Sequence, residues 1–218
     1  MMTKHLIKLY QSYSSHFEAF GKKFPTDSLS GPFLISPANT SYISQKRRLF
    51  VVGSEIRGSG SNCENILHGM EKYERLHKEK DRHNSAFWEI IGKLERNLKI
   101  EAGGSAFTGI SKFTLNISAL NVIYQKEIMS FDEIILGEII RIKPEIVVFI
   151  TGCENDARLK KVFGGLIFNT VKGFNHNEVC SLHHVFLPTN SFRICQIEDL
   201  IHDNLDDRIT ECIANSAN

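Results

Sequence analysis

The chain has 218 residues, of which 42% are hydrophobic and 23% are charged, a composition that suffices for one sizeable buried core. Its formal net charge of +1 excludes a globally basic protein, so any nucleic-acid binding would require a local patch. The five cysteines form no C-x-x-C pair and the nine histidines show no metal-ligand spacing, which argues against a disulfide framework and predicts a metal-free cytoplasmic protein with reduced thiols.

The N-terminal part of the chain predicts a helix and a buried strand on either side of a loop. Its first residues contain no long apolar run, which predicts neither a signal peptide nor a membrane span. Apolar residues recur at helical spacing over residues 4–20, and three prolines mark residues 24–40 as a loop. The run Leu-Phe-Val-Val, closed by Gly53, predicts a buried strand over residues 48–53.

The middle of the chain predicts three helices and a second strand. Apolar residues on one side predict a helix over residues 64–80, and Ser85 is a suitable N-cap for a stronger helix that ends near Leu98. Residues 113–120 partly alternate between apolar and polar side chains, which predicts a strand. Residues 127–142 again show helical spacing, up to a proline.

The C-terminal part predicts two more strands of a parallel sheet. The unbroken apolar run in residues 145–152 is typical of a strand buried on both faces. A helix is predicted over residues 155–163, a last parallel strand over residues 183–188 and a closing helix over residues 196–205. We expect the last dozen residues to be frayed.

The alternation of strands and helices predicts a single domain over residues 1–218, with an N-terminal helix at 4–20 and a core of about 32–205. The predicted fold class is α/β, a three-layer α/β/α sandwich around a central, mostly parallel sheet of four to five strands. Short basic clusters at 22–23, 46–48 and 160–161 are interpreted as solvated surface groups.

Two segments carry candidate functional residues. In an open α/β sheet, ligands bind where strands end in loops, and residues 53–60 follow a predicted strand. They provide a carboxylate, Glu55, a cation, Arg57, and glycines that let a backbone approach a ligand or hold an anion; a flexible turn explains them equally well. Asn116, in the second predicted strand, is either a satisfied core amide or a donor and acceptor for a ligand.

The order of these motifs resembles the uracil-DNA glycosylase superfamily over about residues 32–205. The motifs are a strand that ends in G-x-E-x-x-G, a helix with Phe87-Trp88, a strand with an Asn, the run Lys-Pro-Glu-Ile-Val-Val-Phe-Ile-Thr-Gly and a last strand that ends in a polar loop. In that family the first loop holds a water-activating carboxylate and the second strand ends in an Asn that reads a flipped base. A late His-Pro-Ser loop contacts the leaving base and the DNA backbone.

Carried over to this sequence, the resemblance implies that Glu55 activates water and that Asn116 reads the base, with Asn121 as the alternative because the strand register is open. Stacking on the base would fall to Phe87 or Trp88, although such a pair on an amphipathic helix more often packs into the core. The residues expected around the base are Gly53, Ser54, Ile56, Arg57, Gly58, Phe87, Trp88, Thr189 and Asn190. The residues expected on the DNA backbone are Ser191 and Arg193.

Two departures from the family pattern bear on the substrate. The late loop around Thr189 holds no His, so a neutral donor would stabilise the leaving base less than the family's His. The Pro and Tyr that follow the carboxylate in uracil-specific members are replaced by Ile56 and Arg57, which opens the wall that excludes substituents at C5 of a pyrimidine. Arg57 could then contact hydroxyls or phosphate with its fork of donors.

The resemblance therefore implies a monomeric, cofactor-free DNA glycosylase that flips out and excises a modified or damaged base. A bulky 5-substituted cytosine, such as the glucosylated hydroxymethylcytosine of phage DNA, would suit the open wall and an antiviral role. The cysteine spacing excludes the iron–sulfur cluster that some relatives hold. Conventional uracil excision repair and a non-catalytic nucleic-acid-binding module on the same fold are the alternatives.

Overall fold

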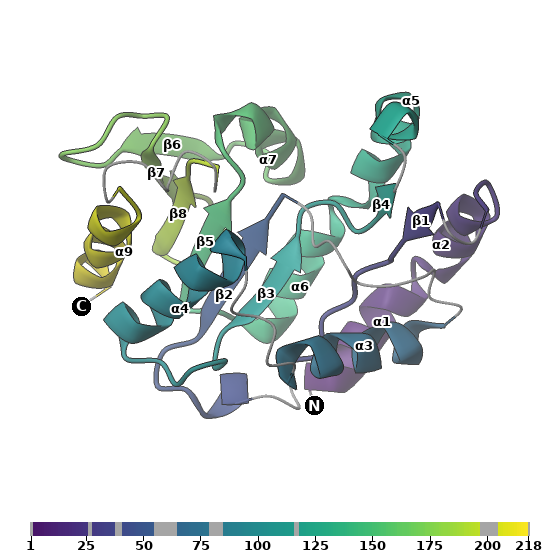
Figure 1. The fold of residues 1–218 in the computed structure, drawn as a ribbon, viewed down its shortest axis with the longest axis horizontal. Helices are drawn as coiled ribbons and strands as arrows, with labels where there is room; N and C mark the ends of the chain where they lie inside the picture. Colours follow the sequence, from purple (N-terminus) through teal and green to yellow (C-terminus); the bar gives the residue numbers. More distant parts are fainter. Residues whose placement is uncertain are drawn as a thin grey trace.

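The computed structural model describes residues 2–25, 28–37, 41–54, 65–78, 85–115, 118–196 and 205–217, with only the backbone described at 78 and 118–122. A six-stranded, mostly parallel sheet forms its centre and helices flank it (Figure 1), which confirms the predicted three-layer α/β/α class with more strands than the four to five expected. Within the described residues, no helix is both long and apolar enough to cross a membrane.

The central sheet has the strand order β3-β2-β5-β8-β7-β6, in which the first four strands run parallel and β7 pairs antiparallel with both β8 and β6, so β7 alone runs against the other described strands of this sheet. Its strands are β2 Leu49–Gly53, β3 Ala106–Gly109, β5 Ile146–Ile150, β6 Ile167–Thr170, β7 Val179–His183 and β8 Asn190–Ile194. All residues of β2 and β5 are buried, because both strands are covered on both faces, and this confirms the two strands predicted from apolar runs.

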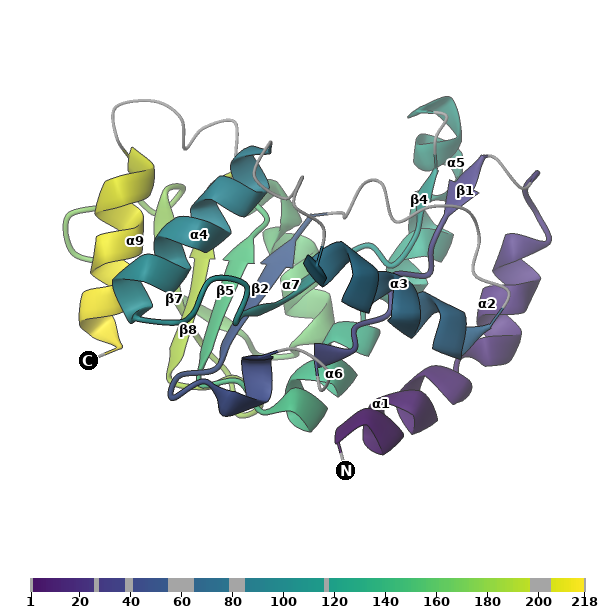
Figure 2. The same ribbon diagram turned by 60° about the horizontal axis from the view of Figure 1, so that its bottom comes forward.

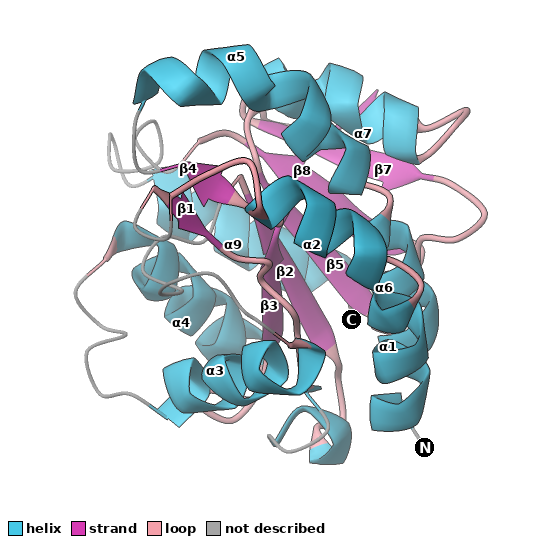
Figure 3. Cartoon of the chain, turned by 90° about the vertical axis from the view of Figure 1, so that its right-hand side faces the viewer, coloured by secondary structure: helices cyan, strands magenta, loops and turns pink. Residues whose placement is uncertain are grey.

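Helices cover both faces of this sheet. The helices are α1 Met2–Gln11, α2 Ser14–Gly21, α3 Ile66–Lys78, α4 Ala86–Leu98, α5 Ser118–Ile128, α6 Ile134–Ile142, α7 Asp156–Val162 and α9 Leu205–Ser216. Figure 2 shows α4 and α9 side by side on one face. Figure 3 shows α1, α6 and α7 on the opposite face. Short 3-10 helices occupy Ser41–Ser44, Met129–Phe131 and Cys153–Asn155.

The second predicted strand, at 113–120, is wrong in position. The strand beside β2 is β3, whose short Ala-Phe-Thr-Gly sequence carries little strand signal, so its pairing with β2 decides its conformation. Of the predicted segment, Thr114 and Leu115 form β4, which pairs with β1 (Leu29–Ser30) in a separate two-stranded sheet. Residues from Ser118 onward are helical in α5.

The predicted last parallel strand, at 183–188, is also wrong. His183 ends β7, which runs antiparallel to β8, and the apolar residues Val185 and Phe186 that suggested a strand are 84% and 50% exposed. The fourth parallel strand is β8. Its sequence Asn-Ser-Phe-Arg-Ile gives no buried-strand signal, because the charge of Arg193 is compensated inside the protein by Asp156.

Both ends of the chain differ from the prediction. The helix expected over 4–20 is divided into α1 and α2 at Ser12, whose hydroxyl donates to the carbonyl of Leu9 at 2.6 Å and so competes with helix continuation. The last dozen residues, expected to be frayed, lie mostly in α9, which buries Ile209 and Ile213. The predicted closing helix at 196–205 falls almost entirely outside the described residues.

Two smaller predictions also change. Ser85 precedes α4 as expected, but its side chain makes no capping hydrogen bond among the described residues. The helix predicted over 127–142 is shorter: α5 ends at Ile128, a 3-10 turn follows, and α6 begins at Ile134. The helices predicted at 64–80 and 155–163 are confirmed as α3 and α7.

A polar network lies inside the core between β3 and α6. The Lys112 ammonium donates to both oxygens of Glu138, at 2.9 and 2.8 Å, and to Thr108 Oγ1 at 2.6 Å. The Tyr10 hydroxyl from α1 donates to Glu138 at 2.9 Å. Both members of the ion pair have fully buried side chains, so each charge depends on the other for compensation.

Candidate functional site

The carboxyl ends of the parallel strands define the candidate site. After β2 the chain forms β3 on one side of β2, and it then crosses to form β5 on the other side of β2. The topological switch point therefore lies between β2 and β5. In open α/β sheets, ligands bind outside the carboxyl ends at this point. Gly53 pairs with Ile150 in the last row of the two strands, so Ser54 and Thr151 are the first residues beyond the sheet.

The end of β2 is held by the segment that follows β3. The Ile110 N–H donates to the Gly53 carbonyl at 2.8 Å, and the Ser111 N–H donates to the Ser54 carbonyl at 3.1 Å. The backbone is therefore fixed up to the residue before Glu55. Four predicted site residues of this loop lie outside the described residues: Glu55, Ile56, Arg57 and Gly58.

The aromatic pair on α4 divides between the core and the site. The Trp88 ring packs edge-on against Phe107, with ring centroids 4.5 Å apart. Phe87 lies over the end of β2, because a Cβ added to Gly53 would come within 3.0 Å of its ring. Of the two residues expected to stack on a base, Phe87 is the one at the carboxyl ends of the strands.

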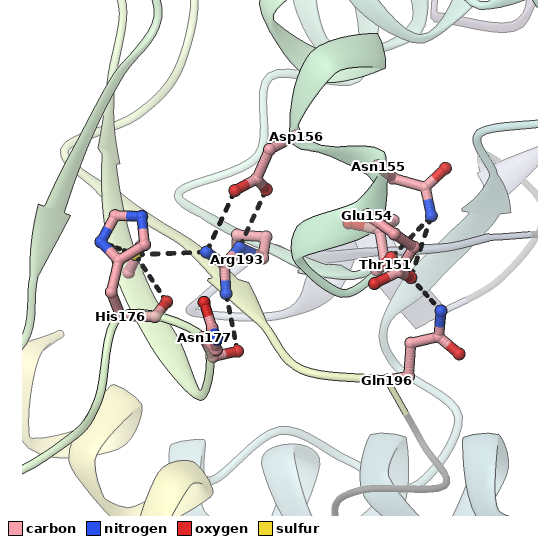
Figure 4. Close-up of polar contacts among 9 residues, drawn as sticks. Thr151, Glu154, Asn155, Asp156, His176, Asn177, Arg193 and Gln196 are labelled. Carbon is pink, nitrogen blue, oxygen red and sulfur yellow. Dashed lines mark hydrogen bonds and ion pairs between the residues drawn. The ribbon is translucent and has the colours of Figure 1, made fainter.

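The turn between β5 and α7 contributes two polar side chains, Glu154 and Asn155, to a group at the ends of the strands (Figure 4). The Asn155 amide donates to the Thr151 carbonyl at 2.7 Å and to Glu154 Oε1 at 3.2 Å. The Gln196 amide, just beyond β8, donates to the same Glu154 oxygen. Glu154, Asn155 and Gln196 thus form one group across the ends of β5 and β8, which we call the amide–carboxylate cluster.

Gly152 makes this turn possible. Its φ of 67° and ψ of 169° belong to a backbone region that side chains disfavour, and an added Cβ would lie 2.2 Å from a Glu154 oxygen. Its N–H donates to the Ile194 carbonyl at 3.1 Å, which ties the turn to β8. The backbone angles and the close contact with Glu154 therefore require glycine here.

We expect Gly152→Ala to lower the free energy of unfolding by about 1–3 kcal/mol, through backbone strain and the displaced Glu154 carboxylate. Urea unfolding followed by circular dichroism measures the change. Gly164→Ala is the matched control, because no atom lies within 4 Å of its added Cβ, and we expect its change to stay within about 1 kcal/mol. Equal losses in the two variants would contradict the role of Gly152.

A bidentate ion pair braces the same edge. Arg158 of α7 donates to both oxygens of Asp132, at 2.9 and 2.6 Å, to Ser111 Oγ at 3.1 Å and to Asn155 Oδ1 at 3.3 Å. Burial raises the pKa of the Asp132 carboxyl, although the Arg158 guanidinium opposes the shift. Through its bonds to Ser111 and Asn155, Arg158 connects the segment after β3 with the turn after β5, and the pair with Asp132 holds the guanidinium in place between them.

Thr151 carries a buried hydroxyl that has no hydrogen-bond partner among the described residues. By strand register it lies level with Ser54 on one side and Cys195 on the other. Leaving a buried hydroxyl unpaired costs about 1–3 kcal/mol. A ligand or water that bonded Thr151 would remove this cost, which makes Thr151 a candidate contact at the switch point.

The predicted late loop lies at the other edge of the sheet. Asn190 pairs with Ile146, the first residue of β5, so Thr189 and Asn190 lie at the amino ends of the parallel strands, away from Gly53. Ser191 is buried and its hydroxyl donates to the Pro188 carbonyl at 2.7 Å. This corrects the expectation that these residues meet the loop after β2.

Arg193, expected on the DNA backbone, is also corrected. Its side chain is 0% exposed and its Nε lies 3.0 Å from an Asp156 oxygen. Its Nη1 donates to the Asn177 carbonyl at 2.9 Å. A guanidinium committed to these partners inside the protein cannot also bind a phosphate at the surface.

The sequence prediction did not include the amide–carboxylate cluster. A signal for Glu154 and Asn155 was present, because the segment Thr-Gly-Cys-Glu-Asn follows the clearest strand of the chain, where ligands bind in α/β sheets. Gln196 could not be predicted, because the sequence of β8 gives no signal of a parallel strand.

The two residues predicted to read the base cannot be placed by their side chains. Asn116 lies outside the described residues, and Asn121 lies in α5, where only the backbone is described.

Within the described part of the chain, no three His, Cys, Asp or Glu side chains are grouped so that they could hold a metal ion. A scan of the sequence against protein-family models finds no match, and a search of curated proteins finds none either.

Proposed function

We propose that the protein is a DNA glycosylase that flips a modified or damaged base out of DNA and hydrolyses its N-glycosidic bond. The observation that carries the proposal is the fixed backbone of Ser54 at the switch point between β2 and β5, because Glu55 is the next residue in the chain. Polar groups of the neighbouring strands gather at the same edge.

The chemistry requires a carboxylate at this place. Cleavage of an N-glycosidic bond passes through an oxocarbenium-like state, as glycoside hydrolysis does. A carboxylate beside C1′ stabilises the positive charge and orients the attacking water. In the proposed reaction Glu55 takes this role, since it directly follows a strand end whose carbonyls are held by Ile110 and Ser111.

A flipped base needs polar partners and an aromatic surface, because leaving the helix stack costs a few kcal/mol. Phe87 offers a ring over the end of β2, and the Gln196 amide, which uses one N–H on Glu154, has a second N–H to offer beyond the end of β8. In the proposal Asn116, which follows β4 directly, reads the base. Gln196, immediately beyond the last parallel strand, supplies the neutral donor to the leaving base.

The substrate class follows from the residues after Glu55. Ile56 and Arg57 replace the Pro and Tyr that close the pocket of uracil-specific enzymes, so the proposed substrate is a bulky 5-substituted cytosine or uracil. Glucosylated hydroxymethylcytosine of phage DNA is the proposed target, with antiviral defence as the setting. The proposed enzyme works in the cytoplasm as a monomer and without a cofactor.

Base release tests the proposal. Duplexes that carry uracil, 5-hydroxymethylcytosine or glucosylated 5-hydroxymethylcytosine are incubated with the protein, and abasic sites are cleaved with alkali. We expect strand breaks with the glucosylated base, and we expect Glu55→Gln to slow them about 10²-fold, the usual contribution of an acid–base group. Glu211→Gln, on the exposed face of α9, is the matched control and should keep the wild-type rate.

The other outcomes separate the alternatives. Breaks at uracil alone would assign conventional excision repair. An absence of breaks while the duplex is still bound would leave a non-catalytic nucleic-acid-binding module. Base release that is equally fast in Glu55→Gln would refute the role of Glu55.

A further inference from the structure

The antiparallel edge of the sheet and the end of α7 concentrate positive charge. Residues 156–193 contain five Lys or Arg and two Asp or Glu, a formal charge of +3 against +1 for the whole chain. Both carboxylates are engaged: Asp156 pairs with Arg193, and Glu178 accepts a backbone N–H in the β6–β7 turn. The exposed lysines of this region, which have no ion pair with a described residue, are Lys160, Lys161 and Lys172.

Aromatic rings lie beside one of these lysines and on the connection that follows β7. The Lys160 ammonium is 5.3 Å from the centroid of the Phe168 ring on β6, and the His176 ring lies 6.4 Å from the same ring. On the connection between β7 and β8, the rings of His184 and Phe186 lie 5.5 Å apart. Phe186 is half exposed and directly follows Val185, which is 84% exposed, and neighbouring exposed apolar side chains can mark an interaction site.

The surface lies at an open edge of the sheet. Among the described strands, β6 is the outermost and pairs with β7 alone, and Ile167 at its start is 56% exposed. Figure 1 shows β6 and α7 next to each other at this end of the molecule. α7 begins at Asp156, directly after Asn155 of the amide–carboxylate cluster, and ends at Val162, so this helix connects the candidate site with the edge.

We infer that this surface binds a single-stranded stretch of nucleic acid. We call it the basic edge and define it by Lys160, Lys161, Phe168, Lys172, His176, His184 and Phe186. Lysines suit any anionic surface, but the exposed rings of His176 and Phe186 on the same edge give unpaired bases a stacking partner, which a phospholipid headgroup does not use. The inference rests on the proposed function for its DNA partner, and it adds where the strand beyond the flipped base runs.

Fluorescence anisotropy of a labelled single-stranded oligonucleotide, with about 20 unmodified nucleotides to span more than one stacking site, tests the inference on the full chain. We expect Lys160→Ala/Lys161→Ala to raise Kd about 5- to 10-fold near 0.1 M salt. The slope of log K against log salt should fall by about 1.4, as expected for two lost phosphate contacts. Phe186→Ala should weaken binding about 5-fold with an unchanged slope, because stacking is not ionic.

Lys22→Ala/Lys23→Ala is the matched control, since it removes two adjacent exposed lysines that each pair with a glutamate elsewhere. The inference is overturned if this control loses as much affinity, if the Lys160/Lys161 variant binds with the wild-type Kd and slope, or if the protein binds phosphatidylserine vesicles but not the oligonucleotide. Oligonucleotide binding in Glu55→Gln separates the two proposals. If the Lys160/Lys161 variant releases the base and keeps the wild-type Kd, only the basic edge is refuted. If the wild-type protein binds the oligonucleotide but releases no base from any duplex, only the proposed catalysis is refuted.

Discussion

Glu138→Leu is expected to lower the free energy of unfolding by about 3–5 kcal/mol, because it leaves the Lys112 ammonium buried without its counter-charge. Lys112 has a fully buried side chain, and among the described residues only Thr108 would still accept its proton, at 2.6 Å. Burial raises the pKa of the Glu138 carboxyl and lowers the pKa of the Lys112 ammonium, so desolvation outweighs the attraction within the pair. The pair is therefore costly to break and adds little stability while intact.

Urea unfolding of three proteins tests this reasoning. The single variant should unfold at much lower urea than the wild type, with a similar dependence on denaturant. The double variant Lys112→Met/Glu138→Leu should recover most of the loss, because replacing both charges by apolar side chains of similar size is often neutral or stabilising. A double variant as unstable as the single one would show that Glu138 acts through its hydrogen bond with Tyr10 rather than through the ion pair.

Arg193→Met is expected to cost about 3 kcal/mol of stability, a value near that for removing one partner of a buried pair. Asp156 would lose both hydrogen bonds of the guanidinium, at 3.0 and 3.2 Å. Burial already raises the pKa of the Asp156 carboxyl and Arg193 opposes the shift, so the pKa should rise further in the variant. When a carboxyl has a higher pKa in the folded than in the unfolded protein, its contribution to the free energy of unfolding is lost as the pH rises through the folded-state pKa.

The difference in unfolding free energy between the wild type and Arg193→Met should therefore become smaller as the pH is lowered from neutral toward the ordinary pKa of an aspartate. Thermal or urea unfolding at several pH values measures it. Arg208→Met, an exposed arginine on α9 that lies over the Phe174 ring, is the control and should change stability by less than about 1 kcal/mol. A stable Arg193→Met protein that binds DNA more weakly would contradict the buried role and restore a phosphate contact.

The sequence correctly predicted the strands that are made of apolar residues because both of their faces are covered. β2 and β5 read as unbroken apolar runs because helices cover both faces of them. β8 occupies an equally buried position, but the buried Arg193 makes its sequence look polar, and its partner Asp156 lies far away in the chain. The exposed Val185 and Phe186 produced the opposite error, since apolar residues at a surface imitate a strand.

The candidate site was predictable to the same extent. Gly53 and Ser54 lie at the switch point as their strand signal suggested. The cluster of Glu154, Asn155 and Gln196 depends on which strands end side by side, and adjacency between β5 and β8 is a property of the sheet order, not of local sequence. Residue pattern gives the ends of individual strands, whereas topology decides which ends meet.

The mixed sheet also sets an order of assembly. Its antiparallel part joins residues close in the chain, as in the pairing of Val179 with Ile194, whereas the parallel centre joins Leu49 to Ile146. Closing a long chain segment loses more entropy before any contact compensates for it. During refolding from denaturant, amide protons of β7 and β8 should therefore become protected from exchange with solvent before those of β2, and the carboxyl edge that carries the proposed chemistry is completed last.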